Sequence, residues 1–285
     1  MIYITQLFFI LFGSVSGMGS SHNTLPLSEP DMVLVAGGAF TMGCKDGRDS
    51  TCFNDEKPAH RVTLRDFYIG RYEVTNAEYC RFLNEKENQK EGVAEWIDLT
   101  GRFNDEKCRI SKNENLFTVD TGYENHPVIY VSWYGAAAYC AWLSQQTGQN
   151  YRLPTEAEWE FAARGGSKTR NYLYAGSNTL DEVAWHRVNS NGQIQAVGAK
   201  KANELDLFDL SGNVWEWCAD DWHGDYKGAP ANGGGWIQSP DRGANRVIRG
   251  GGWNFEPKRC RAAVRYYVGP QSRSSDVGFR VARQD

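Results

Sequence analysis

The sequence predicts an α+β fold in which short strands and a few helices are joined by long irregular loops. The 285 residues include 30 glycines, 10 tryptophans and 14 tyrosines. Aromatic side chains bury large areas while glycine-rich connections turn tightly, so this mixture is typical of an ordered, loop-rich globule rather than a helical bundle. Segments with strand character and segments with helix-start signals also occur together along the chain. The net charge of −4 offers no basic field, so nucleic acid is not expected as a partner.

The first 17 residues resemble a secretory signal peptide, because an apolar run is followed by small residues. No Lys or Arg precedes the run, and a buried N-terminal strand is the alternative. The run is too short to span a bilayer, and no stretch past residue 30 is apolar enough to do so. We therefore expect an exported protein without a membrane span after signal removal. Residues 18–31 are rich in Ser, Pro and Asn and predict a linker, and the folded domain is expected over residues 32–285.

The seven cysteines are an odd number, so at least one is free, metal-bound or paired with another chain. Cys44 and Cys52 lie in one turn-rich segment, where a disulfide is plausible in an exported protein. Cys80 and Cys140 fall within predicted helices, which favours small buried hydrophobes. No Cys-x-x-Cys pair occurs, so a structural zinc site is not expected.

The N-terminal third predicts strands followed by one helix. Strand character appears at residues 32–35, 40–43, 61–64 and 67–69, with glycine turns and a polar loop between them. Thr75 and Glu78 form a capping box, which predicts a helix of about three turns starting at Asn76. Residues 85–125 have no clear periodicity and predict a surface insertion.

The middle of the chain predicts a strand and two helices. Residues 126–131 have strand character, and residues 133–147 show helical spacing with Gly148 placed to end the helix. A second capping box, Thr155 to Glu158, predicts a helix that ends near residues 165–166. Its acidic residues are interpreted as helix-dipole partners and salt-bridge formers: Glu156, Glu158 and Glu160.

A candidate metal site lies at residues 212–217, after a loop-like stretch from 172 to 202. Asn213 and Glu216 offer hard oxygen ligands three residues apart, and a bend there would add backbone carbonyls. Calcium sites are assembled from such donors. The alternative is that both side chains only form hydrogen bonds within the turn.

The C-terminal segment from Arg249 to Arg280 is the candidate functional region. It contains three consecutive glycines, Cys260, six arginines and several aromatic residues. This composition is a poor match for a plain core strand. The segment therefore presents either a reactive thiol or a recognition surface.

Several segments together resemble the formylglycine-generating enzyme family, also called sulfatase-modifying factors. The matching segments are Met42-Gly43, residues 68–70 and 73–75, residues 127–133, Arg-Leu-Pro-Thr-Glu-Ala-Glu-Trp-Glu-Phe-Ala-Ala-Arg at 152–164, Gly-Asn-Val-Trp-Glu-Trp at 212–217, residues 249–253 and Gly278-Phe279-Arg280. The resemblance runs from about residue 32 to the end. It implies a single domain, distantly related to C-type lectins, with much irregular loop.

The resemblance also implies cofactors. Catalytic members of the family use two C-terminal cysteines, which bind copper and oxidise a substrate cysteine to formylglycine with O2. Aligning the three glycines places Phe255 at the first of these positions and Cys260 at the second, so Cys260 is the candidate catalytic residue and half of the copper site is missing. The Gly-Asn-Val-Trp-Glu match favours calcium at Asn213 and Glu216.

Two functional hypotheses follow, each with a protein or peptide as partner. In the first, the chain is a cysteine oxidase whose Cys260 is favoured as thiolate by neighbouring arginines. Its alternative is that Cys260 is simply a buried thiol. In the second, the chain is a C-type-lectin-like ligand-binding protein without catalysis. The candidate ligand-binding residues are Trp253, Phe255, Arg259, Arg265, Tyr266, Tyr267 and Arg273. The alternative is that arginines of this segment are internal, above all Arg249, Arg261 and Arg280.

Overall fold

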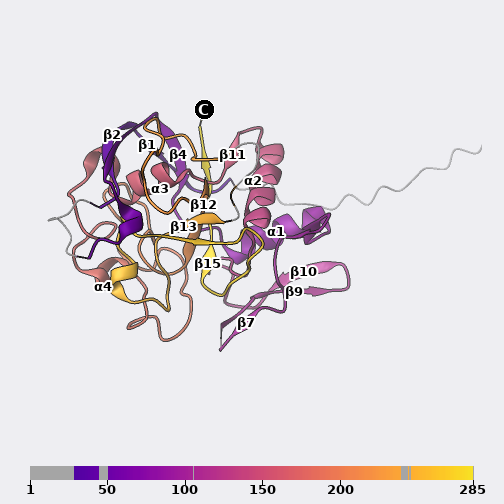
Figure 1. The fold of residues 1–285 in the computed structure, drawn as a ribbon. Coiled ribbons are helices and arrows are strands. Elements are labelled where there is room, and N and C mark those ends of the chain that lie inside the picture. The colour runs from indigo at the N-terminus through magenta and orange to yellow at the C-terminus, as the bar shows by residue number, and fades with distance from the viewer. Residues whose placement is uncertain (1–28, 45–50, 105, 239–242, 244, 285) are drawn as a thin grey trace, which may run out of the picture.

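Two small four-stranded sheets and three helices of two or more turns form the framework of the computed structural model (Figure 1). The structure describes residues 29–284 except 45–50, 105, 239–242 and 244. The predicted signal peptide and most of the predicted linker lie outside the described residues. The α+β class expected from the sequence is confirmed, with long connections between short elements.

The first sheet joins the two ends of the domain. Its strand order is β1 (Met32–Val35), β4 (Phe67–Gly70), β16 (Ala282–Arg283) and β11 (Tyr151–Arg152), all antiparallel. A separate two-stranded ribbon pairs β2 (Gly38–Met42) with β3 (His60–Leu64). All four strands predicted in the N-terminal third are therefore present.

The second sheet contains the candidate region. Its order is β14 (Arg265–Val268), β13 (Arg246–Arg249), β12 (Trp215–Asp221) and β15 (Val277–Gly278), and only the β12–β15 pairing is parallel. β12 and β13 are almost entirely buried, whereas the β14 edge exposes two tyrosines. The C-terminal segment thus contributes the two outer strands of this sheet and the loops between them.

The three predicted helices are confirmed as α1 (Asn76–Lys86), α2 (Trp133–Thr147) and α3 (Glu156–Ala163). Thr75 and Thr155 accept hydrogen bonds from the third residue of their helices, and both capping boxes are complete. Gly148 ends α2 in the left-handed conformation at φ 73°. A single-turn helix, α4 (Leu180–Val183), lies in the stretch expected to be loop.

Two expectations for the middle of the chain are corrected. Residues 85–125 were expected to be loop in a surface insertion; most of them are exposed, but they form three hairpins: β5 (Lys90–Glu91) with β6 (Ala94–Glu95), β7 (Arg102–Phe103) with β8 (Glu106–Lys107), and β9 (Ile110–Asn113) with β10 (Leu116–Val119). Phe117 on β10 is buried in the core, as are Trp96 and Ile97, which directly follow β6. The strand predicted over residues 126–131 is absent: residues 127–131 are buried, and isolated bridges hold Pro127 to Thr75 and Val131 to Ile97.

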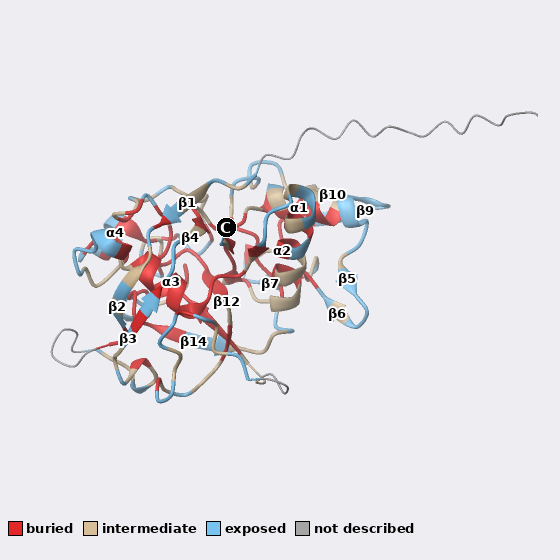
Figure 2. Ribbon diagram, turned by 90° about the horizontal axis from the view of Figure 1, so that it is seen from above, coloured by how far each residue is buried: buried red, intermediate tan, exposed pale blue. Residues whose placement is uncertain are grey.

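Two hydrophobic clusters form the core. One packs α1 and α2 against β12 and contains a group of touching aromatic rings: Tyr79, Phe82, Tyr139, Trp142 and Phe279. The other lies between α3 and the N-terminal strands. Figure 2 shows α3 and β12 in red, as buried elements. Within the described residues, no helix has the length and apolar character needed to cross a membrane.

Candidate functional site

Four buried arginines hold the C-terminal segment to the rest of the domain. Arg249, Arg261, Arg265 and Arg280 are at most 1% exposed. Each contacts a carboxylate of another element: Arg249 contacts Glu160, Arg261 contacts Glu56, Arg265 contacts Glu156, and Arg280 contacts Glu216. Bidentate guanidinium–carboxylate pairs fix geometry as well as charge. The segment is therefore a rigid part of the fold.

Arg265, which the sequence analysis assigned to ligand binding, is one of these buried arginines. Nε and Nη2 of Arg265 each donate to the Glu156 carboxylate over 2.7 Å. The prediction that Arg265 binds a ligand is therefore wrong, since its guanidinium is satisfied inside the protein. The prediction of internal arginines at 249, 261 and 280 is confirmed, as is ion pairing by Glu156, Glu158 and Glu160.

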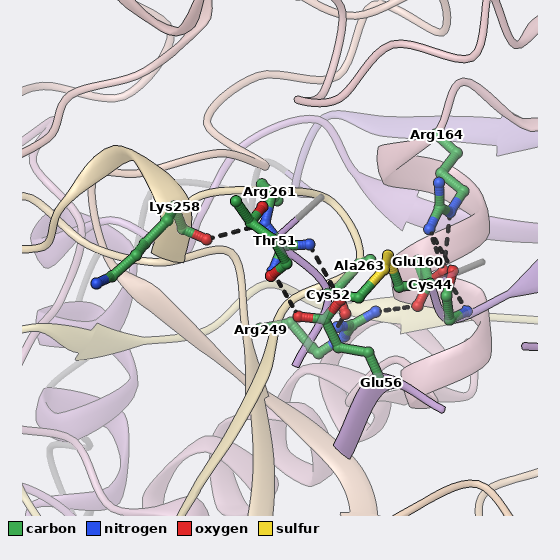
Figure 3. Close-up of a disulfide and its surroundings, with 11 residues drawn as sticks. Cys44, Thr51, Cys52, Glu56, Glu160, Arg164, Arg249, Lys258, Arg261 and Ala263 are labelled. Carbon is green, nitrogen blue, oxygen red and sulfur yellow. Dashed lines mark hydrogen bonds and ion pairs between the residues drawn. A yellow bond between two sulfur atoms is a disulfide. The ribbon is translucent and has the colours of Figure 1, made fainter. Parts of the chain in front are cut away.

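The Cys44–Cys52 disulfide lies beside this framework (Figure 3). Arg261 donates from Nη2 to the Thr51 carbonyl over 3.0 Å and to Oε1 of Glu56 over 2.6 Å. The Cys44 amide in turn donates to the Glu56 carbonyl over 2.9 Å. The predicted disulfide is present, and hydrogen bonds from Arg261 to Thr51 and Glu56 hold the adjoining N-terminal segment to the arginine that follows Cys260.

Cys260 is a buried thiol. Its side chain is 0% exposed and packs with Leu180, Val183 and Ala184. Burial raises the pKa of the Cys260 thiol to about 12. The expectation that neighbouring arginines favour the thiolate is wrong, because the adjacent Arg261 is paired with Glu56 and desolvation dominates at the sulfur.

The residues present do not fit a copper site of the family type. Phe255 supplies no sulfur at the other expected position, and Cys260 faces an apolar cluster. In the part of the chain that the structure describes, one group of three His, Cys, Asp or Glu residues brings its ligand atoms within 4.8 Å: Cys44, Cys52 and Glu56. Its two sulfurs are joined in the disulfide, so they are not available as thiolate ligands.

Asn213 and Glu216 are both engaged with protein groups. Asn213 accepts from the Gln195 amide over 3.0 Å and donates to Glu73 over 2.7 Å. The Glu216 carboxylate accepts two hydrogen bonds from Arg280 and one from Trp159 Nε1. Both groups keep acceptor capacity, because the Asn213 oxygen accepts one hydrogen bond at two lone pairs and the Glu216 carboxylate accepts three at about four.

The sequence analysis did not single out Asp209, a second buried carboxylate whose pKa is affected by Glu216. Oδ2 of Asp209 accepts from the Gly198 amide over 2.7 Å, but its buried Oδ1 has no partner. Burial and the nearby Glu216 carboxylate raise the pKa of Asp209 to about 6. Burial, Asp209 and Glu216 likewise raise the pKa of Glu73. Three carboxylates lie around the single guanidinium of Arg280, and a hard cation would stabilise their ionised forms.

A sequence signal for Asp209 existed. The residue stands between Phe208 and Leu210, in a run where the neighbouring leucines are buried. An acidic residue in such a run needs a compensating partner when it is buried.

The predicted ligand-binding residues separate into a surface group and an interior group. Tyr266 and Tyr267 on β14 are 40% and 41% exposed. The Arg259 guanidinium lies over the Phe53 ring at 4.6 Å and over the Tyr266 ring at 5.7 Å. Phe255 joins the same surface through Trp215, whose ring contacts both Phe255 and Tyr266.

Two other predicted ligand-binding residues lie elsewhere. Trp253 is 4% exposed and donates from Nε1 to the Ser275 carbonyl over 3.1 Å, so its prediction as a displayed residue is wrong. Its position directly after three glycines suggested a loop, but the indole packs into the larger core cluster. Arg273 forms an ion pair of 2.6 Å with Glu95 on β6 rather than joining the tyrosines.

Comparison with known proteins supports the resemblance over nearly the whole chain. A family model described as sulfatase-modifying factor enzyme 1-like domain matches residues 20–285. The formylglycine-generating enzyme of Streptomyces coelicolor is 31% identical, over 90% of this chain and 90% of that protein. The Mus musculus protein named inactive C-alpha-formylglycine-generating enzyme 2 is 32% identical, over 89% of this chain and 86% of that protein.

Two further similarities concern a longer protein and a solved structure. The serine/threonine-protein kinase pkn1 of Chlamydia pneumoniae is 34% identical over 89% of this chain, which spans 38% of the length of that kinase. The structure of PvdO from Pseudomonas aeruginosa matches with a TM-score of 0.75 and 31% identity, over 90% of this chain and 95% of that one.

Proposed function

The chain belongs to the sulfatase-modifying factor enzyme 1-like domain family, and we propose that it is an exported, partner-binding member without formylglycine-generating activity. Its partner is a protein or peptide that contacts the C-terminal segment, residues 249–280. One observation carries the proposal: within this segment the Cys260 thiol is buried, whereas Tyr266 and Tyr267 are exposed with Arg259 beside them.

The surface of this segment has the properties of a binding hot spot. Tyr266 and Tyr267 stack on each other at 5.4 Å, and Tyr267 also contacts the Trp222 ring at 4.6 Å. Rigid aromatic side chains supply contact area at low entropic cost, and planar guanidinium groups add directional contacts. The buried arginine pairs hold this surface in place before a partner arrives, which lowers the cost of binding.

Copper-dependent oxidation of a cysteine is the competing proposal, and family membership is its support. It requires a second soft ligand and a thiolate near neutral pH. A single thiol with a pKa of about 12 supports neither requirement. One experiment separates the two proposals: the reduced protein is incubated with copper, O2 and a Cys-x-Pro-x-Arg peptide. We expect no loss of the peptide thiol, and loss that is abolished by Cys260→Ser would overturn the proposal.

Binding itself is tested by selection from a random heptapeptide library displayed on phage. We expect the protein to enrich specific peptides, and Tyr266→Ala with Tyr267→Ala to weaken their binding at least about tenfold, since hot-spot residues contribute about 2 kcal/mol or more. Phe103→Ala is the matched control, because Phe103 is 52% exposed on another element, β7. Absence of any enrichment contradicts a peptide-binding function.

We further propose that calcium binds at the carboxylates of Asp209 and Glu216, as a stabilising ion. The unpartnered Oδ1 of Asp209 and the excess of carboxylates around Arg280 support this assignment. Calcium that binds only the folded protein raises the melting temperature. Addition of calcium to chelator-treated protein should therefore raise it, and Asp209→Asn should remove most of the increase. An equal increase in Asp209→Asn and in the parent protein would exclude this site.

A further inference from the structure

A charged cavity of about 340 Å³ opens beside Phe255, at the position that the family alignment assigns to the missing cysteine. Six residues line it: Arg187, Asn254, Phe255, Glu256, Lys258 and Arg259. Arg259 also lies over the Tyr266 ring, so one side chain borders both the cavity and the exposed tyrosines. The Lys258 carbonyl accepts a hydrogen bond from Arg261 Nε over 3.1 Å, so the cavity adjoins the buried arginine framework described above.

The cavity carries an excess of positive charge in a protein whose net charge is −4. Glu256 is the one carboxylate among its lining residues, and its oxygens lie 3.2 Å from Lys258 Nζ and 4.0 Å from Arg187 Nη1. Arg187 and Lys258 remain 68% and 54% exposed in their side chains. In Figure 3 the Lys258 ammonium points away from the buried ion pairs. One carboxylate opposite three cations leaves room for a second acidic group.

Asn254 gives the cavity a polar group that lacks a partner. Its Oδ1 is buried and accepts no hydrogen bond. The residues on either side are fixed, because the Trp253 amide donates to the Asn213 carbonyl over 2.7 Å and the Phe255 amide donates to the Gly252 carbonyl over 3.0 Å. A buried acceptor without a donor is destabilising, so a ligand N–H at this oxygen supplies the hydrogen bond that it lacks.

We propose that this cavity binds an acidic segment of an extended peptide. An Asp or Glu side chain of the peptide lies among Arg187, Lys258 and Arg259, and a peptide N–H donates to Oδ1 of Asn254. The adjoining residues of the peptide contact Tyr266 and Tyr267. A free carboxylate or phosphate ion satisfies the cations but supplies no amide donor and reaches neither tyrosine. This inference rests on the proposed peptide-binding function and specifies its ligand.

The composition of the heptapeptides selected from the phage library tests the inference. We expect the protein to enrich peptides with Asp or Glu, and replacement of those residues by Gln or Asn in a synthetic copy to weaken binding at least about tenfold, as expected for a charge-assisted contact. Lys258→Glu and Arg187→Glu should each weaken the same peptide, and Lys258→Glu should shift the selected pool toward neutral or basic sequences. Lys168→Glu, an exposed reversal on another element, is the control.

A second substitution tests the amide contact. Asn254→Ala should weaken the acidic peptide severalfold while leaving the melting temperature nearly unchanged, because its Oδ1 has no partner to lose within the protein. Free glutamate and inorganic phosphate, titrated at the same concentrations, should compete only weakly.

The outcomes separate the inference from the proposed function. A pool of neutral or basic peptides that still depends on Tyr266 and Tyr267 overturns the acidic specificity and keeps the binding function. Competition by phosphate as strong as that by the peptide overturns the peptide assignment. Failure to enrich any peptide overturns both.

Discussion

The position of Cys260 determines whether the side chain can react. The sulfur lies beneath Gly251, where a Cβ would come within 2.8 Å of it, and it is fully buried. A thiol with a raised pKa in an apolar environment reacts slowly, because the thiolate is the nucleophile.

The first prediction follows from this burial. At pH 8, iodoacetamide should modify Cys260 in the folded protein at least about a hundredfold more slowly than in urea, because the thiolate is scarce and shielded. Mass spectrometry of tryptic peptides measures both rates, and the unfolded sample is the internal control. Equal rates in the two states would show that the thiol is accessible and would reopen the oxidase proposal.

A substitution at Arg280 tests how much one of the four buried arginine–carboxylate pairs contributes to stability. Its guanidinium pairs with Glu216 and donates to the carbonyls of Gly70 and Phe208. Arg280→Met removes these contacts and leaves a buried carboxylate unpaired, which costs about 3–5 kcal/mol of unfolding free energy. Lys201→Met, in an exposed pair with Glu182, is the control and should cost at most about 1 kcal/mol. Urea unfolding measures both, and similar losses would contradict a structural role for the Arg280 pair.

Side-chain burial in this segment was only partly predictable from sequence. The family motif identified Arg249, Arg261 and Arg280 as internal. Arg265 and Trp253 were assigned to the surface, because a local pattern of arginines and aromatics does not reveal which distant carboxylate or carbonyl completes them. Their partners are Glu156 on α3 and Ser275 before β15.

At the scale of elements, the helices were predictable and the hairpins were not. A capping box is a local signal in which two side chains satisfy two backbone amides, so Thr75 and Thr155 mark helix starts from sequence alone. The hairpins of residues 90–119 have strands of two to four residues. Such short strands carry little periodicity, and their stability comes from packing against α1 and α2.

The capping box of α1 provides a prediction at this scale. The Thr75 hydroxyl accepts a hydrogen bond from the Glu78 amide, so Thr75→Ala should lower the free energy of unfolding by about 1 kcal/mol. Thr75→Ser keeps the hydroxyl and should lose less. Chemical denaturation of the two variants gives the comparison, and equal losses would show that the hydroxyl contributes nothing at this helix start.

At the scale of the whole molecule, buried carboxylates make stability depend on pH. Asp220 is a buried carboxylate close to Glu156. It accepts hydrogen bonds from the Glu156 and Trp236 amides, each over 2.7 Å. Burial, reinforced by repulsion from Glu156, raises the pKa of Asp220 from 3.8 to about 7. The folded state therefore binds a proton between these pH values that the unfolded state has released.

This difference fixes the sign of the last prediction. Stability contributed by the Asp220 proton is fully present below pH 4 and is lost as the pH rises to about 7, with a slope of at most about 1.4 kcal/mol per pH unit. Asp220→Asn cannot titrate, so its unfolding free energy should fall less than that of the parent protein between pH 5 and pH 8.

Because Asn keeps one acceptor oxygen for only one of the two amides, the variant should also be less stable at pH 5. Urea unfolding at several pH values measures how steeply the unfolding free energy changes with pH. This slope does not depend on the hydrogen bond that Asp220→Asn loses at every pH. Parallel stability curves for the two proteins would mean that Asp220 is ionised throughout this range, and that the surrounding arginines outweigh its burial.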